Sequence, residues 1–229
     1  MKTIKKTTKK TSKSREPNCP KWQEFLNKAL KGDLAKITAL QKFFGYCLSD
    51  PDTDKYQKAL LLCGPGLGKS TAAKILVRIM EEQNVSRLSL SEMADPFKVI
   101  GLENKLLNIS DGDADFPPRR LVDARTLKEI IAGEFIRAKR KFEKDLTFIP
   151  AAKLVFVLNY RPRTTTLKEG GIARRFVTIY FPAGNISPKS VNPNLYEQLR
   201  TEQPEILRWA LKGLARLNAD MQFTAPAPF

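Results

Sequence analysis

The chain has 229 residues, 42% of them hydrophobic, which is enough for one α/β domain with modest helical additions but hardly for two full domains. Its formal net charge of +16 suits a polyanionic partner, because neutralised phosphates release counterions, although a solubilising surface is the alternative. Histidine is absent and the three cysteines are widely spaced, which excludes histidine-based nucleophilic triads, histidine metal sites and a zinc ribbon.

The N-terminal end has no hydrophobic leader, and no apolar run is long enough to cross a bilayer. We therefore expect a cytoplasmic protein without a membrane partner. Residues 1–18 are rich in Lys, Thr and Ser and lack apolar periodicity, so we expect a disordered basic tail. This tail is either a nucleic-acid arm or an inert solubilising segment.

A small N-terminal helical prefix is expected over residues 19–54. Apolar side chains recur at helical spacing over residues 22–30, and Lys31-Gly32-Asp33 is typical of a helix end followed by a new N-cap. A second helix with one apolar face follows over residues 37–48. We expect the aromatic side chains of both helices in a hydrophobic core rather than in a ligand site.

Residues 55–187 form the predicted core. The apolar run Ala59–Leu62 predicts a strand buried on both faces of a parallel sheet, and a helix is expected to begin near Ser70. Strands that alternate with helices predict an α/β fold with helices on both faces of the sheet. A C-terminal helical segment, residues 188–229, contains a helix that Pro204 opens. Three further buried strands and one helix are expected at Leu106–Ile109, Leu154–Leu158, Phe176–Phe181 and Leu121–Ala132.

The segment Cys63–Thr71, between the first strand and the first long helix, has the pattern of a P-loop. Lys69 would reach the β- and γ-phosphates of ATP, and the Ser70 hydroxyl would take a Mg²⁺ position. The first glycine of the G-x-x-x-x-G-K-[ST] pattern falls on Cys63, so either Cys63 tolerates the required geometry or the loop begins at Gly64. The expected ATP-binding residues are Gly64, Pro65, Gly66, Leu67, Gly68, Lys69, Ser70 and Thr71.

Carboxylates follow the strand that begins near Leu106. ATP hydrolysis needs an acid near Mg²⁺ and a group that orients the attacking water. Asp111 is the candidate metal-side acid, and Asp113 is the candidate base, with Asp115 as its competitor. A solvated acidic turn is the alternative, because Asp-Gly-Asp is also good turn chemistry.

Two further signals are weak on their own, because Asn and Arg are common at strand edges. Asn159 ends the strand Leu154–Leu158, where a sensor of the γ-phosphate would lie. Arg174 and Arg175 directly precede another buried strand. An arginine finger stabilises charge on the transferred phosphoryl group and is often supplied by a neighbouring subunit.

Taken in order, these segments resemble the helicase domain of superfamily 3, of the phage and plasmid primase–helicase type, over about residues 19–223. The resemblance implies an AAA+-like P-loop NTPase that assembles as a ring, usually a hexamer, with ATP and Mg²⁺ held between subunits. Besides the P-loop, it is carried by residues 43–48, 105–113, 127–133, 148–154, 159, 173–176 and 206–214.

By this resemblance Lys69, Ser70, Asp111, Asn159 and one of the two arginines take the roles given above. The family often has glutamate where this chain has Asp111 and Asp113, which leaves the water-activating base open. The primase half of the family is missing, so a separate primase is a possible partner.

The family has a DNA-gripping hairpin between the second acidic motif and the sensor strand, and the matching segment lies near residues 134–149. Basic groups there would follow the DNA backbone, and an interleaved aromatic residue could stack on bases. A solvated charged loop is the alternative. The expected DNA contacts are Arg137, Lys139, Arg140, Lys141 and Lys144.

The leading hypothesis is an ATP-dependent DNA helicase or translocase that acts in the replication of a phage, plasmid or mobile element in a bacterial cell. Two alternatives stay open. One is a DNA-binding ATPase switch that does not unwind, such as a loader or an origin remodeller. The other is an interference protein that joins the helicase ring of another element.

Overall fold

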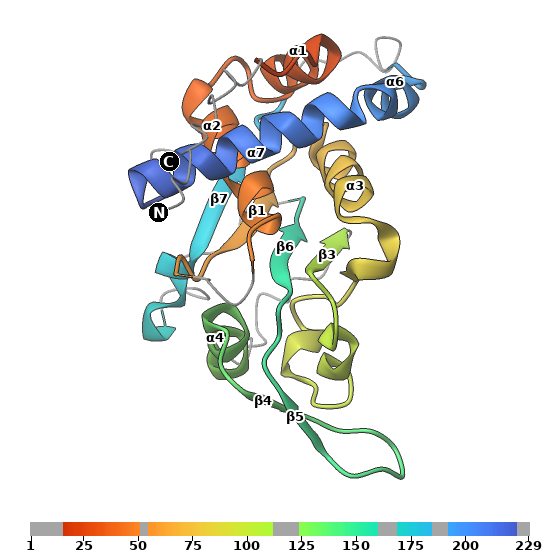
Figure 1. Cartoon of the computed structure of the whole chain (residues 1–229), viewed down its shortest axis with the longest axis vertical. Coiled ribbons are helices and arrows are strands. Elements are labelled where there is room, and N and C mark those ends of the chain that lie inside the picture. Colours follow the sequence, from red (N-terminus) through yellow and green to blue (C-terminus); the bar gives the residue numbers. More distant parts are fainter. Residues whose placement is uncertain (1–15, 51–54, 112–123, 160–168, 185–191, 224–229) are drawn as a thin grey trace, which may run out of the picture.

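The structure, a computed structural model, describes residues 16–50, 55–111, 124–159, 169–184 and 192–223. Its centre is a five-stranded parallel sheet with the strand order β2-β3-β6-β1-β7 (Figure 1). The predicted strands are confirmed to within two residues at each end. The strands are β1 (Ala59–Cys63), β2 (Val85–Ser86), β3 (Leu107–Asp111), β6 (Lys153–Val157) and β7 (Phe176–Tyr180).

Strand β1 lies between β6 and β7, with Leu60 opposite both Val155 and Val177. All five of its residues are buried, as expected for a strand covered on both faces. The segment that follows β1 therefore starts from an interior strand, at the carboxyl edge of the sheet. In open α/β sheets, ligands bind outside this edge, at the point where the strand order switches.

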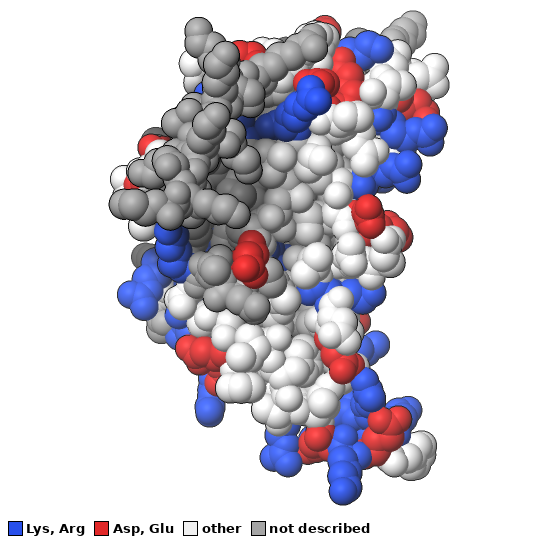
Figure 2. All heavy atoms as spheres, in the orientation of Figure 1, with Lys and Arg blue, Asp and Glu red and all other residues white. Residues whose placement is uncertain are grey.

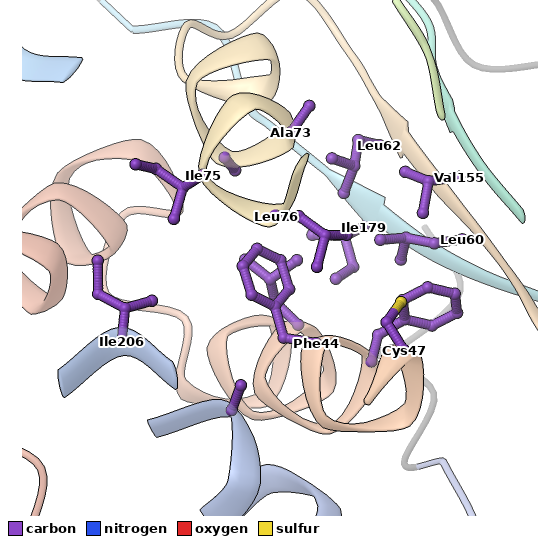
Figure 3. Packing of buried hydrophobic residues seen from close by; sticks show 14 of the residues in the cluster. Phe44, Cys47, Leu60, Leu62, Ala73, Ile75, Leu76, Val155, Ile179 and Ile206 are labelled. Atoms are coloured by element: carbon purple, nitrogen blue, oxygen red, sulfur yellow. The ribbon is translucent and has the colours of Figure 1, made fainter. Parts of the chain in front are cut away.

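One face of the sheet is covered by helices from both ends of the chain. Phe44, Ile75 and Ile206 come from three different helices and pack toward Leu60, Leu62 and Ile179 of the sheet (Figure 3). The expected N-cap of the second helix is confirmed, since the Asp33 carboxylate accepts a hydrogen bond from the Lys36 amide at 3.1 Å. The helices on this face are α1 (Pro20–Ala29), α2 (Leu34–Cys47), α3 (Lys69–Met80), α6 (Leu195–Thr201) and α7 (Gln203–Asp220).

Helices α2 and α7 cross at very close range because each has a glycine at the crossing. A Cβ atom on Gly213 would lie 2.0 Å from the Gln41 carbonyl oxygen, and one on Gly45 would lie 2.3 Å from the Leu214 amide nitrogen. The buried Gln41 side chain then joins the helices, donating to the Trp209 carbonyl at 2.9 Å and accepting from Arg216 at 2.6 Å. The two ends of the chain thus form one helical layer.

Of the elements that the structure describes, helix α4 (Ala124–Ala132) and several 3₁₀ turns pack on the second face of the sheet, so the prediction of helices on both faces is confirmed. A two-stranded antiparallel hairpin, β4 (Ile136–Ala138) and β5 (Leu146–Phe148), projects from the end of the molecule remote from α1 and α3 (Figure 1). Among the described residues, no helix has the length and apolar composition that a membrane span requires. The 3₁₀ turns on this face are η3 (Glu92–Ala94), η4 (Val99–Leu102) and η5 (Glu169–Arg175), whereas η2 (Glu82–Asn84) contacts α3.

Candidate nucleotide-binding site

The glycine-rich loop connects the end of β1 with the start of α3. Cys63 is the last residue of β1 and pairs with Tyr180, and the first positive φ, 107°, belongs to Gly64. The turn of the loop therefore begins at Gly64. A Cβ atom on Gly66 would lie 2.3 Å from the Pro182 carbonyl oxygen, so this position accommodates glycine alone.

The first turn of α3 presents backbone amides to this loop. Gly68, with φ 104°, precedes the helix, and the first intrahelical bond runs from the Ala72 amide to the Gly68 carbonyl at 2.9 Å. The amides of residues 69–71 therefore have no carbonyl of the preceding turn to bind. Together with the helix dipole they favour an anion, and the glycines leave room for phosphate oxygens close to the backbone.

Lys69 holds its ammonium group over the loop. Its Nζ donates to the Gly64 carbonyl at 2.5 Å and to the Gly66 carbonyl at 2.7 Å, and only 6% of the residue is exposed. Burial lowers the pKa of Lys69, an effect that the nearby Asp111 carboxylate opposes. The loop thus concentrates a positive charge where the β- and γ-phosphates of a nucleotide would lie.

Ser70 and Asp111 come together from different elements. The Ser70 hydroxyl, in the first turn of α3, donates to the Asp111 carboxylate at 3.1 Å. Asp111 is the exposed last residue of β3. A hydroxyl and one carboxylate beside a phosphate site are a donor set that Mg²⁺ accepts, since this ion keeps several waters and uses few protein ligands. Within the described ranges no group of three or more Cys, Asp or Glu residues is arranged so that it could hold a metal ion by itself.

A pocket of 650 Å³ extends from the loop, with walls that come from both ends of the chain. Phe25 of α1 lies against the loop, at 3.1 Å from the position that a Cβ atom on Gly68 would take. Tyr196 of α6 also lines the pocket. The lining residues are Lys21, Glu24, Phe25, Lys28, Ala29, Pro65–Thr71, Asn159, Asn192, Pro193, Leu195, Tyr196 and Gln198.

Sequence reasoning missed these walls. Phe25 was expected only in the hydrophobic core, and it belongs both to that core and to the pocket. Nothing in the pattern of α1 or α6 marks a ligand site, because the two segments meet only through tertiary packing. The volume lies in the range of pockets that hold small molecules and cofactors.

Asn159 lies in the same pocket as the glycine-rich loop. It follows Leu158, whose amide donates to the Leu62 carbonyl at 2.8 Å, so the end of β6 is tied to the end of β1. Asp113 and Asp115, the candidates for the base, lie outside the described residues.

Arg174 and Arg175 lie at the other end of the sheet. Phe176, which follows them, pairs with Ala59 at the start of β1, whereas the loop leaves β1 after Cys63. At about 3.3 Å per residue, β1 alone separates the two ends by about 13 Å. The arginines therefore do not reach the pocket of their own chain.

The hairpin is basic, but its cations differ in their contacts. Arg137 pairs with Asp145 at 2.9 Å, and Arg140 pairs with Glu103 of the body of the protein at 2.6 Å. A longer ion pair, at 3.3 Å, joins Arg140 to Glu143. The carboxylates of Glu143 and Glu103 raise the pKa of Arg140. Figure 2 shows Lys, Arg, Asp and Glu side chains gathered around the projecting end of the molecule.

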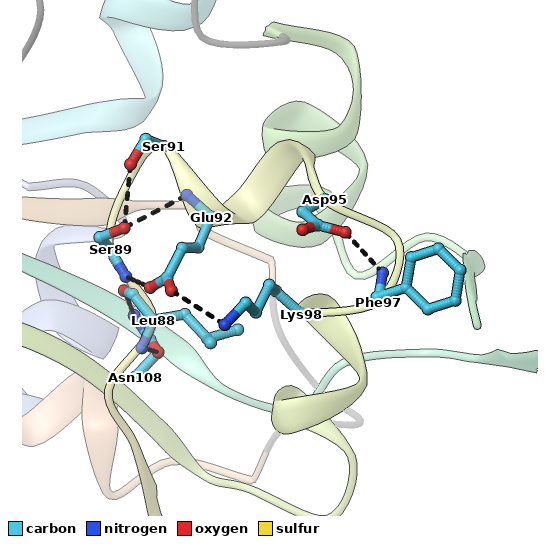
Figure 4. A network of polar contacts seen from close by, with 8 residues as sticks. All are labelled: Leu88, Ser89, Ser91, Glu92, Asp95, Phe97, Lys98 and Asn108. Atoms are coloured by element: carbon cyan, nitrogen blue, oxygen red, sulfur yellow. Dashed lines mark hydrogen bonds and ion pairs between the residues drawn. The ribbon is translucent and has the colours of Figure 1, made fainter. Parts of the chain in front are cut away.

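A polar network links the hairpin to β3, the strand that ends in Asp111. The buried Asn108 side chain of β3 accepts from the Leu88 amide at 2.8 Å and donates to the Leu88 carbonyl at 2.9 Å. Glu92 then binds the Ser89 amide at 2.9 Å and pairs with Lys98 (Figure 4). The Lys139 amide of the hairpin donates to the Pro96 carbonyl at 2.8 Å, which completes the connection.

A protein-family model, described as a family of unknown function (DUF5906), matches residues 62–175, from the end of β1 to the paired arginines. A solved apo structure of the C-terminal region of NrS-1 is similar, with a TM-score of 0.65 and 16% identity over 89% of this chain and 49% of that one. A second apo structure of this region, residues 305–718, gives a TM-score of 0.66 and 14% identity over 93% and 54%. A ligand-bound JCV helicase gives a TM-score of 0.46 and 15% identity over 88% and 67%.

The chain has the fold of the NrS-1 region. It spans about half the length of these NrS-1 structures. The fold class predicted from the sequence, a P-loop parallel sheet with helices on both faces, is thereby confirmed.

Proposed function

We propose that this chain hydrolyses ATP and uses the energy to move along and unwind DNA in the replication of a phage, plasmid or mobile element. The observation that carries the proposal is the phosphate cradle between β1 and α3, with the Lys69 ammonium over the loop and the Ser70 hydroxyl bonded to Asp111. The confirmed fold supports it.

Each residue of the cradle has a role in this reaction. The backbone amides at the start of α3, residues 69–71, would bind the phosphates, with Pro65 and Leu67 shaping the loop, and Lys69 would neutralise the β- and γ-phosphates. Ser70 and Asp111 would hold Mg²⁺, and the ion would supply positive charge that neutralises the phosphates. Asn159 at the end of β6 would orient the attacking water. The base would be Asp113 or Asp115.

The pocket beyond the phosphates supports a complete nucleotide as the ligand, since an inorganic anion would leave most of 650 Å³ unused. Its lining residues Phe25 and Ala29 of α1 and Leu195 and Tyr196 of α6 offer apolar surface to a base. The carboxamide of Gln198 and the Lys28 ammonium also line the pocket and would bind the polar edges of the base and the ribose.

The position of the paired arginines supports action between subunits. They lie at the end of the sheet opposite the cradle, so a subunit that offers its own cradle to one neighbour can offer its arginines to another. This arrangement suits a ring, and we propose a hexamer. A separate primase is the proposed partner. The cellular setting that goes with the role is the bacterial cytoplasm.

Strand displacement on a forked duplex tests the proposal. The purified chain is expected to separate the strands with ATP and Mg²⁺, and to fail with a non-hydrolysable ATP analogue or after Lys69→Ala. Hydrolysis of ATP without any displaced strand would remove the motor function and favour a DNA-binding ATPase switch. Displacement that requires co-assembly with a longer homologue would favour the interference protein.

The hairpin supports contact with DNA through its tip. Phe142 is fully exposed at the tip with φ 65°, and Lys141 and Lys144 beside it are exposed. Of the five proposed contacts, Arg137 and Arg140 are ion-paired within the chain, and Lys139 lies over the Phe97 ring, 5.8 Å from its centroid. The tip lysines are therefore the cations best placed to bind phosphates.

We expect the double variant Lys141→Ala/Lys144→Ala to weaken binding to single-stranded DNA. Because each phosphate contact contributes about 0.7 to the slope of log K against log salt, this slope should become shallower by about 1.4. Binding isotherms over a salt series measure it. Arg137→Ala, which removes a cation already paired with Asp145, is the matched control and should change the slope by less. Equal slopes in all three proteins would contradict a role of the tip.

A further inference from the structure

The two neighbouring arginines, Arg174 and Arg175, have different surroundings. Both lie at the end of η5, which Ile172, only 2% exposed, anchors in the hydrophobic core against α4. The main chain at this position is therefore fixed by the fold, and only the side-chain contacts distinguish the two residues.

Arg175 is bound within its own subunit. It is half-buried, and its guanidinium donates to the Gln57 side-chain oxygen at 2.8 Å. Gln57 in turn donates to the Ala132 carbonyl at 3.4 Å and has a φ of 51°, an unusual backbone conformation for a residue other than glycine. This chain of contacts joins the start of β7, the segment before β1 and the end of α4.

Among the described residues, Arg174 is held through its main chain. Its carbonyl oxygen accepts a hydrogen bond from the Lys58 ammonium. Its side chain is exposed and lies over Gly171, where a Cβ atom would be 3.7 Å from the Arg174 Nε. In the part of the chain that the structure describes, no ion pair or side-chain hydrogen bond of the Arg174 guanidinium is present.

Lys58, Arg174 and Arg175 also form a cluster of three positive charges. Among the described residues no carboxylate forms an ion pair with any of them. Burial, and then repulsion from Arg175 and Arg174, lowers the pKa of Lys58. A phosphate brought to this cluster would relieve the repulsion, and the cradle of the same chain is too far away to supply it.

We propose that Arg174, and not Arg175, is the arginine that stabilises the γ-phosphate bound by a neighbouring subunit, and that Lys58 positions it by holding its carbonyl. This inference rests on the proposed ATPase function. Arg175 and Gln57 keep the supporting backbone in place from within the subunit. The exposed guanidinium of Arg174 carries the charge across the subunit interface.

The assignment separates three kinds of variant. Arg174→Ala should lower kcat by about 1,000-fold, the lower end of the range for arginine fingers, and leave the affinity for a fluorescent ATP analogue unchanged. Lys58→Met should lower kcat by a smaller factor than Arg174→Ala does and leave the affinity for the ATP analogue unchanged. Lys58→Arg, which keeps a hydrogen-bond donor, should retain most of the wild-type kcat. Arg175→Ala should lower the melting temperature, whereas its effect on kcat should be small.

Mixing experiments with the full chain test whether Arg174 acts in trans. Subunits with Lys69→Ala and subunits with Arg174→Ala are each inactive, but in mixed assemblies some interfaces combine an intact cradle with an intact Arg174. We expect hydrolysis to return on mixing. Arg208→Ala, which removes an exposed arginine paired with Glu205 on α7, is the control and should hydrolyse ATP like the wild type.

Three outcomes overturn the assignment. Wild-type kcat in Arg174→Ala together with a strong loss in Arg175→Ala would exchange the roles of the two arginines. No recovery on mixing would place the action of Arg174 within its own subunit. If the wild-type chain fails to hydrolyse ATP at all, the proposed function falls as well, which distinguishes that failure from the first two.

Discussion

Replacement of Lys69 with alanine is expected to lower the rate of ATP hydrolysis at least about 100-fold, equivalent to about 2.7 kcal/mol of transition-state stabilisation. In the proposed function the Lys69 ammonium lies beside the transferred phosphoryl group, and burial would strengthen its interaction with the developing charge because water screens a buried charge little. Release of inorganic phosphate measures the effect, and the melting temperature shows whether the variant is folded.

Lys74→Ala is the matched control for this variant. Lys74 is exposed on the same helix, α3, but it does not line the pocket that contains the glycine-rich loop. It should keep wild-type hydrolysis. Equal hydrolysis of ATP by Lys69→Ala and Lys74→Ala would contradict the assignment of the cradle. So would a loss of activity in Lys69→Ala that is explained entirely by unfolding of this variant.

The geometry of the glycine-rich loop was predictable because the loop is contiguous in sequence. The short apolar strand before it, the glycines and the helix after it set its geometry through local backbone rules, and Gly64 and Gly68 have the positive φ angles that such a turn requires. Asp111 was also predictable, since parallel strands bring their carboxyl ends to one edge of the sheet. The Ser70–Asp111 contact follows from these two facts.

The walls of the pocket were not predictable, because they depend on helix packing rather than on a motif. Phe25 has the pattern of an ordinary core residue of an amphipathic helix, and only the packing of α1 and α6 brings it to the same pocket as Tyr196. The different contacts of Arg174 and Arg175 were hidden for the same reason. They depend on Gln57 and Lys58, which lie more than a hundred residues earlier. Strand β2 was missed because two residues carry no periodic signal.

The crossing of α2 and α7 carries the largest stability effect that we expect. Gly213→Ala would place a methyl group 2.0 Å from the Gln41 carbonyl oxygen, which belongs to the backbone of α2 and cannot rotate away. The helices would have to separate, and Gln41 would lose its bonds to Trp209 and Arg216. Alanine favours helix formation by about 1 kcal/mol over glycine, but the overpacking and lost hydrogen bonds outweigh this gain.

We therefore expect Gly213→Ala to destabilise the protein by about 2 kcal/mol, which corresponds to a fall of about 4–8 °C in the melting temperature. Gly101→Ala is the control, because a Cβ atom there would meet only the Leu88 side chain, at an ordinary 3.6 Å, and its stability should change by less than about 0.5 kcal/mol. Thermal unfolding of both variants measures the difference. A melting temperature of Gly213→Ala equal to that of Gly101→Ala would show that the helices can separate without cost. The layer that positions Phe25 and Tyr196 around the pocket would then be a loose one, and nucleotide affinity should be insensitive to the α2–α7 crossing.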